Sequence, residues 1–212
     1  MNQNEHIEAL QDIRSIMERS SRFISLSGLS GVFAGVYAIL GALAAYQHLS
    51  LNITSNNYYQ YAINANGRYE MGFLSFFFLD AGLVLLASIL TCYLLTNRKA
   101  KKSGQKIFDK TAIRLAINLF IPLLTGGLFC LILLNHKQLA LIAPCMLLFY
   151  GLALINASKY SLHNIRQLGI CEIILGLISA YYIGYGLLFW SIGFGVLHIL
   201  YGIVMYYKYE RS

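Results

Sequence analysis

Two ionisable residues late in the chain have the same arrangement of glycines around them. Glu172 lies in the pattern G-x-x-E-x-x-x-G, and His198 lies in the pattern G-x-x-H-x-x-x-G. The flanking glycines are Gly169, Gly176, Gly195 and Gly202. Residues three and four apart lie on one face of a helix, so each ionisable side chain belongs to a stripe of glycines. A carboxyl group and an imidazole brought together in this way could share or exchange a proton.

The spacing also predicts how the two helices pack against each other. In an antiparallel hairpin, residues at equal depth have a constant sum of their residue numbers. The numbers of Glu172 and His198 sum to 370, and the two outer pairs of glycines each sum to 371. We therefore expect Glu172 to contact His198 roughly 20 Å from the turn between the helices, with the glycines meeting in pairs on either side.

Three roles are open for this pair: it fixes the register of the hairpin, it binds a proton or another cation, or it holds a metal. An unpaired charge inside a bilayer costs at least ~2.5 kcal/mol, which an ion pair or a shared proton would offset. Zinc takes three or four protein ligands, and only two are placed together here. We therefore expect neither a metal nor a cofactor.

Other polar residues lie within or near the apolar runs. Asp80 follows a phenylalanine-rich stretch, and an acid inside a membrane span is a functional candidate because its burial is costly. It would be protonated, bonded to a tyrosine or exposed to a wet cavity. A possible cavity open to the cytoplasm would be ringed, together with Glu172, by Arg114, Asn118, Asn156 and Lys159. Arg114 and Lys159 could equally be anchors that reach the lipid headgroups.

The elements that must position these residues are membrane-spanning helices. The chain has 212 residues, of which 58% are hydrophobic and only 12% are charged, about half the charged content of a soluble domain. A helix needs about 17–25 apolar residues to cross a bilayer. Six apolar runs are candidates: 23–47, 72–96, 112–134, 139–157, 168–183 and 187–207. The sequence predicts an all-α bundle of about six spans over residues 23–207, the fifth span being short.

The basic residues predict the orientation of these spans. With the N-terminus inside, the inner segments hold 14 of the 16 Lys and Arg residues, and the outer segments hold only Arg68 and Lys137. Cytoplasmic segments carry such an excess. We therefore expect a multi-pass protein of the cell membrane with both termini in the cytoplasm, including a short tail over 208–212. The cations lie between apolar runs, so we expect the bilayer as partner and no nucleic acid.

The N-terminal part has two further features. Residues 1–22 have apolar side chains at helical spacing, which predicts a short amphipathic helix at the cytoplasmic surface. The first span contains Gly28, Gly31 and Gly35, and its small residues form two faces: Ser27, Gly31 and Gly35 on one, and Ala34, Ala38 and Ala42 on the other. Small faces allow close helix packing, either within the chain or with a partner subunit or a second copy.

These features support three classes of function. The first is binding or transport of a small solute, proton or cation through the Glu172–His198 pair. The second is a non-catalytic scaffold or partner subunit that associates through the first span. An intramembrane enzyme is the third and weakest, because the sequence shows no Ser/His dyad, paired carboxylates or His-x-x-x-His motif.

Overall fold

The computed structural model describes residues 27–49, 58–63, 66–102, 110–161 and 164–211, and helices make up nearly all of this part. The predicted amphipathic helix over 1–22 lies outside the described residues. The helices and short helical turns are α2 (Gly28–His48), η1 (Tyr58–Ala62), α3 (Met71–Lys102), α4 (Lys110–Asn135), η2 (Leu139–Leu141), α5 (Ile142–Ala157), η3 (Ser158–Tyr160), α6 (Asn164–Tyr181), α7 (Gly186–Trp190), η4 (Ser191–Leu197) and α8 (His198–Tyr209).

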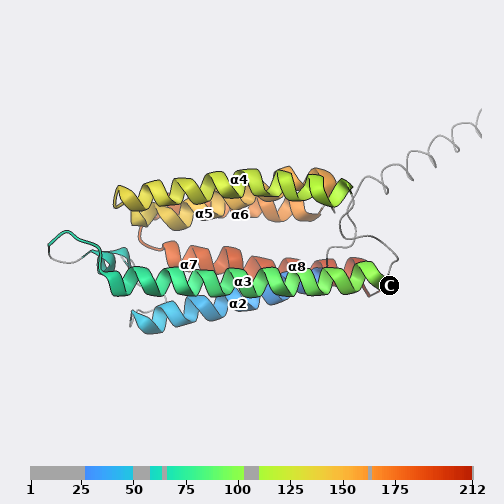
Figure 1. Cartoon of the computed structure of the whole chain (residues 1–212), viewed down its shortest axis with the longest axis horizontal. Helices are drawn as coiled ribbons and strands as arrows, with labels where there is room; N and C mark the ends of the chain where they lie inside the picture. The colour runs from blue at the N-terminus through green and yellow to red at the C-terminus, as the bar shows by residue number, and fades with distance from the viewer. Residues whose placement is uncertain (1–26, 50–57, 64–65, 103–109, 162–163, 212) are drawn as a thin grey trace, which may run out of the picture.

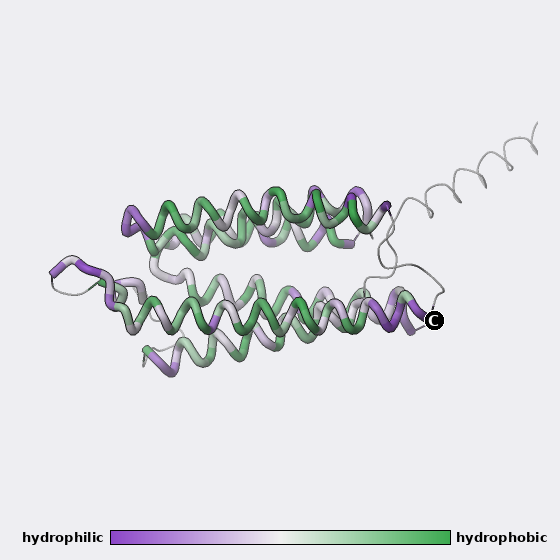
Figure 2. Tube along the Cα trace, viewed as in Figure 1, coloured by the Kyte–Doolittle hydropathy of each residue, from purple (hydrophilic) through white to green (hydrophobic). Residues whose placement is uncertain are grey.

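Apolar helices long enough to cross a bilayer dominate the described part of the chain. There are five: Gly28–His48, Met71–Lys102, Lys110–Asn135, Leu139–Tyr160 and Gly186–Lys208. Hydrophobic residues follow the lengths of the helices, and hydrophilic residues gather mainly near the two ends of the bundle (Figure 2). The prediction of an all-α membrane bundle is therefore confirmed.

The fifth predicted span corresponds to α6, which is shorter than those five helices and is not one of them. It has 18 residues, and it includes Arg166, Gln167 and Glu172. It runs alongside α5 (Figure 1). The count of six spans and the cytoplasmic position of both termini stay predictions.

The helices form two layers (Figure 1). One layer contains α4, α5 and α6, and the other contains α2, α3 and the helix formed by α7, η4 and α8. Within the layers, α5 contacts both α4 and α6, while α2 contacts both α3 and α8. The layers meet where α5 and α6 contact α7 and η4. The last hairpin therefore connects two layers, and its helices have their most extensive contacts elsewhere.

Glycines bring α5 and α6 into close contact. A methyl group added at Gly151 would lie 2.6 Å from the carbonyl oxygen of Gly169 and 2.7 Å from Ile173 Cγ1. A methyl group added at Gly169 would lie 2.8 Å from the carbonyl oxygen of Gly151 and 2.9 Å from Ile155 Cγ1. Each helix thus offers a Gly-x-x-x-Ile unit to the other, and only glycine permits this backbone approach.

The same unit joins α2 to the C-terminal helix. A methyl group added at Gly35 would lie 2.5 Å from the carbonyl oxygen of Gly195 and 2.7 Å from Ile199 Cγ1. In return, a methyl group at Gly195 would lie 2.6 Å from Ile39 Cγ1. One close helix contact in each layer therefore uses the same five-residue Gly-x-x-x-Ile unit.

The predicted pairing of glycines across the last hairpin is wrong. Gly169 and Gly176 face α5, the latter against Leu148, whereas Gly195 and Gly202 face α2. The physical reason is that a glycine stripe lets two backbones approach closely, and it is satisfied by whichever helix lies against it. Here those helices are α5 and α2, because the two arms of the hairpin belong to different layers.

One end of the bundle is joined by the carboxylate of Glu210. It accepts hydrogen bonds from the backbone N–H of Gly28 at 2.5 Å and from the Ser27 hydroxyl at 3.3 Å, and its ion pair with Lys99 Nζ measures 3.2 Å. This cluster links the start of α2, the end of α3 and the residue that follows α8. The helix α8 itself extends to Tyr209, into the segment predicted to be a tail.

Candidate functional site

Glu172 lies in α6 where the two layers meet. Its side chain is fully buried, and neither carboxyl oxygen has a hydrogen-bond partner among the described residues. A methyl group added at Gly193 would lie 2.6 Å from Glu172 Oε2 and 2.5 Å from Leu147 Cδ2. The absence of a side chain at Gly193 therefore makes the space that the carboxyl group occupies.

His198 lies opposite Glu172, at the start of α8, and is 8% exposed. Its Nδ1 lies 2.9 Å from the carbonyl oxygen of Gly193, and its Nε2 lies 2.6 Å from the hydroxyl of Tyr150. A carbonyl oxygen only accepts, so Nδ1 carries a proton and donates it to Gly193. In the neutral imidazole, Nε2 then accepts from the Tyr150 hydroxyl.

The predicted contact between Glu172 and His198 is present, at 3.5 Å between His198 Nδ1 and Glu172 Oε1. This distance allows an ion pair but is longer than an ordinary hydrogen bond. The contact forms without the predicted glycine pairing because of the geometry of α6. Glu172 lies about 60° around the helix from Gly169, so the glycine faces α5 while the longer side chain reaches η4.

A π-helical segment shapes this site. The segment η4 spans Ser191–Leu197 and leads directly into α8 at His198. A π-helix has a wider turn than an α-helix and often occurs at functional sites. The Gly193 carbonyl lies within this segment and is bound by the imidazole five residues later. Hydrophobic periodicity gives no signal for such a segment, so the sequence predicted an uninterrupted α-helix here.

Tyr150 is the member of the site that the sequence did not reveal. It comes from α5, and besides its hydrogen bond to His198 it packs beside Phe194, with 5.0 Å between ring centroids. Phe194 in turn stacks on His198 at 6.0 Å. A tyrosine in an apolar run normally signals packing, and only the assembled layers place its hydroxyl against the imidazole.

This geometry suits a proton better than a metal ion. Among the described residues, no three His, Cys, Asp or Glu side chains gather closely enough to hold a metal. The imidazole is instead hydrogen bonded at both nitrogens and lies beside a carboxyl group that lacks hydrogen bonds. The pair has two protonation states without a net charge: a neutral acid beside a neutral imidazole, and a carboxylate beside an imidazolium. They differ in the location of one proton.

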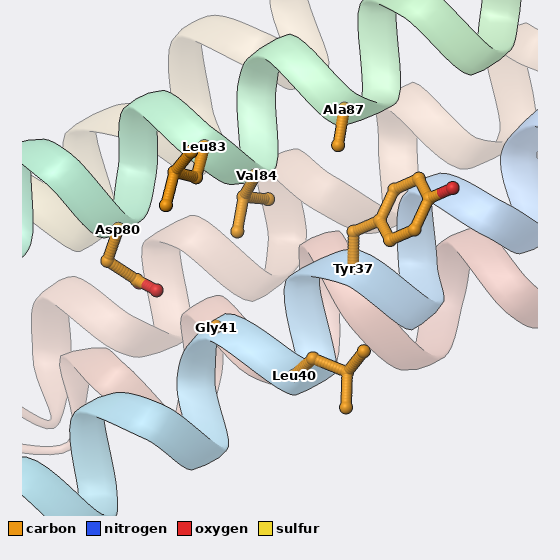
Figure 3. A pocket seen from close by; sticks show the side chains of 7 residues that line it. All are labelled: Tyr37, Leu40, Gly41, Asp80, Leu83, Val84 and Ala87. Carbon is orange, nitrogen blue, oxygen red and sulfur yellow. The ribbon is translucent and has the colours of Figure 1, made fainter.

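Asp80 belongs to another helix contact, the one between α2 and α3. With Tyr37, Leu40, Gly41, Leu83, Val84 and Ala87 it lines a groove of about 290 Å³ between these two helices (Figure 3). A methyl group added at Gly41 would lie 3.1 Å from Asp80 Oδ2. Tyr37 does not bond to the acid; its hydroxyl lies 3.1 Å from Thr91 Oγ1.

The polar residues near the ends of α4 and α5 bond to one another. Asn118 Nδ2 donates to the carbonyl oxygen of Arg114 at 2.8 Å, and Asn156 Nδ2 donates to the carbonyl oxygen of Asn118 at 2.9 Å. Lys159 Nζ lies 3.4 Å from Asn156 Oδ1. These contacts connect α4 to α5, and the Arg114 side chain is exposed. The cytoplasmic cavity bounded by these residues and Glu172 stays a prediction.

The small residues of the first span contact other helices of the same chain. Gly28, Gly31 and Gly35 lie against α8 or η4, and Gly41 lies against α3. Ala38 and Ala42 are also buried, at 2% and 3% exposure. Intramolecular packing accounts for these faces, and association with a partner subunit or a second copy stays a prediction.

Comparison of the chain with models of known protein families, with curated proteins and with solved structures finds no match.

Proposed function

We propose that Glu172, His198 and Tyr150 form an intramembrane proton-binding site, through which the protein couples proton binding to the binding or transport of a small solute or cation. The observation that carries this proposal is the fully buried Glu172 carboxyl group, which lacks hydrogen bonds and lies 3.5 Å from an imidazole. A lone carboxylate at such a place is costly. The acid must therefore hold a proton or lie beside an imidazolium.

The hydrogen bonds of His198 supply a route for that proton. In this proposal, a hydronium ion that reaches the Tyr150 hydroxyl gives it a proton and leaves as water, while the hydroxyl passes its own proton to Nε2 and stays neutral. The imidazolium then carries protons at both nitrogens, and the proton at Nδ1 passes to Glu172 Oε1. The transfer requires Nδ1 and Oε1 to approach from 3.5 Å to hydrogen-bond distance.

A purely structural pair would be built differently. A pair that serves stability alone usually satisfies its lone pairs with further hydrogen bonds, since half-satisfied buried polar groups are unfavourable. Glu172 has no such bonds among the described residues, and neither has the buried Ser179 hydroxyl two turns farther along the same face of α6. Polar groups without hydrogen bonds along this face of α6 support a role in which Glu172 binds and releases a proton.

The test is a pH titration of the carboxyl group by infrared difference spectroscopy, with the full chain in lipid bilayers. We expect a protonated-carboxyl band that changes between about pH 4 and about pH 10, is absent in Glu172→Gln and shifts its midpoint in Tyr150→Phe. The variant Glu70→Gln, at an exposed acid before α3, is the matched control and should keep the band. A Glu172 band that stays constant over this range and does not exchange in D₂O would refute the proposal.

A further inference from the structure

The groove between α2 and α3 has the features of a ligand site that is independent of the proposed proton site. Its walls are apolar except for the carboxyl group of Asp80 and the hydroxyl group of Tyr37 (Figure 3). Among the described residues, no side chain hydrogen bonds to Asp80 or forms an ion pair with it, and Tyr37, the other polar residue of the groove, is bonded to Thr91. The acid is therefore unpaired within a groove that has room beside it.

The depth of each lining residue gives the groove a direction. Asp80 is the tenth residue of α3, so it lies about 14 Å from the start of that helix. Ala87, at the opposite end of the groove, lies near the middle of the 32-residue helix. Gly41 is level with Asp80, and Tyr37 is adjacent to the middle of α2. The apolar run 72–96 is centred on residue 84, so Asp80 lies about 6 Å from the bilayer centre toward the start of α3, and Ala87 lies about 4.5 Å from it toward the other end.

The groove also opens to the surroundings of the bundle. Leu40 and Leu83 are 58% and 59% exposed, and α3 is buried over only a small part of its length. Lipid-dissolved molecules can therefore enter from the side. Such a molecule would place its polar group at Asp80, on the side of the bilayer centre where α3 starts, and its apolar chain across the centre toward Ala87.

We propose that this groove binds a cationic amphiphile, an amine with an apolar chain, whose ammonium group pairs with Asp80. The charge of the acid selects the ligand class: a carboxylate facing lipid is costly alone, and an ammonium donates up to three hydrogen bonds and neutralises it. The chain of the ligand lies along Leu83 and Ala87. An alcohol or a fatty acid of equal length supplies no such charge.

The test is photolabelling of the full chain in lipid nanodiscs with a diazirine-bearing long-chain amine, read by mass spectrometry of the α2 and α3 peptides. Dodecylamine should compete, whereas dodecanol and dodecanoate should not. Asp80→Asn should lower labelling about tenfold, the effect of losing about 1.4 kcal/mol from a charged hydrogen bond. Ala87→Phe, which fills the apolar end and keeps the acid, should also lower it.

Glu70→Gln is the matched control, because it removes an exposed carboxyl group just before α3 without touching the groove. Its labelling should equal that of the wild type, which separates the groove from general attraction of the amine to a charged surface. Equal labelling of Asp80→Asn and wild type would overturn the proposal, and so would competition by dodecanol as strong as that by dodecylamine. Neither result bears on the titration of Glu172.

Discussion

His198 Nδ1 lies 3.5 Å from Glu172 Oε1, although the two residues belong to helices in different layers of the bundle. The imidazole is anchored from both sides, by the Gly193 carbonyl at 2.9 Å and by the Tyr150 hydroxyl at 2.6 Å. The carboxyl group, in contrast, is buried beside Gly193 without a hydrogen bond among the described residues. Substitutions of His198 and of Glu172 should therefore change the stability of the protein by different amounts.

We expect Glu172→Gln to leave the free energy of unfolding unchanged to within about 1 kcal/mol, because the amide keeps the volume and removes a buried acid without hydrogen bonds. His198→Ala should instead lower it by about 2–4 kcal/mol, since it opens a cavity and leaves the Tyr150 hydroxyl and the Gly193 carbonyl without their partner. Reversible unfolding of the full chain in mixed micelles measures both values. A loss in Glu172→Gln as large as that in His198→Ala would show that the pair is structural.

We expect Gly35→Ala and Gly151→Ala each to destabilise the fold by about 1–3 kcal/mol, because the added methyl group would lie against backbone atoms of the neighbouring helix. Gly127→Ala is the matched control: this glycine is also helical, but nothing lies within 4 Å of an added methyl group. It should be neutral or stabilising by up to about 1 kcal/mol. Thermal unfolding measures all three, and equal behaviour of the three variants would contradict the close contacts.

The Glu210 cluster should contribute measurable stability at its end of the bundle. Glu210→Gln should lower the free energy of unfolding by about 1–3 kcal/mol, because a carboxylate with 13% exposure loses its charge beside Lys99 and the start of α2. A double-mutant cycle with Lys99→Met isolates the ion pair. The control is Lys102→Met, an exposed lysine at the end of α3; a coupling energy equal to that of Lys99 would argue against the cluster.

The orientation in the membrane can be tested at two exposed positions, one just before the start of α3 and one near its end. In a cysteine-free background, Glu70→Cys should react with an impermeant maleimide added to intact cells, whereas Lys101→Cys should react only after permeabilisation. The reason is the distribution of Lys and Arg, 14 in the expected inner segments and two in the outer ones. Reaction of Lys101→Cys in intact cells would reverse the orientation.

Local patterns in the sequence determined the helical class of this protein and most of its spans. The helix Met71–Lys102 shows why. An apolar stretch of this length is typical of a membrane span, and in lipid its backbone N–H and C=O groups must hydrogen bond to one another, as they do in a helix. The contact between Glu172 and His198 was also predictable, because matching intervals from the turn place both residues at the same depth. Each inference depends on residues close in sequence or on simple helix geometry.

Tertiary structure decided which helices pair and what surrounds the buried acid. Gly169 faces Gly151 and Gly35 faces Gly195 because the hairpin arms lie in different layers, and a glycine stripe specifies close approach without specifying a partner. Tyr150 reaches His198 only when α5 meets η4, and the π-helical turn that exposes the Gly193 carbonyl has no periodic signature. The members of this site come together only when the helices pack, so the sequence pattern around each residue alone could not predict the whole site.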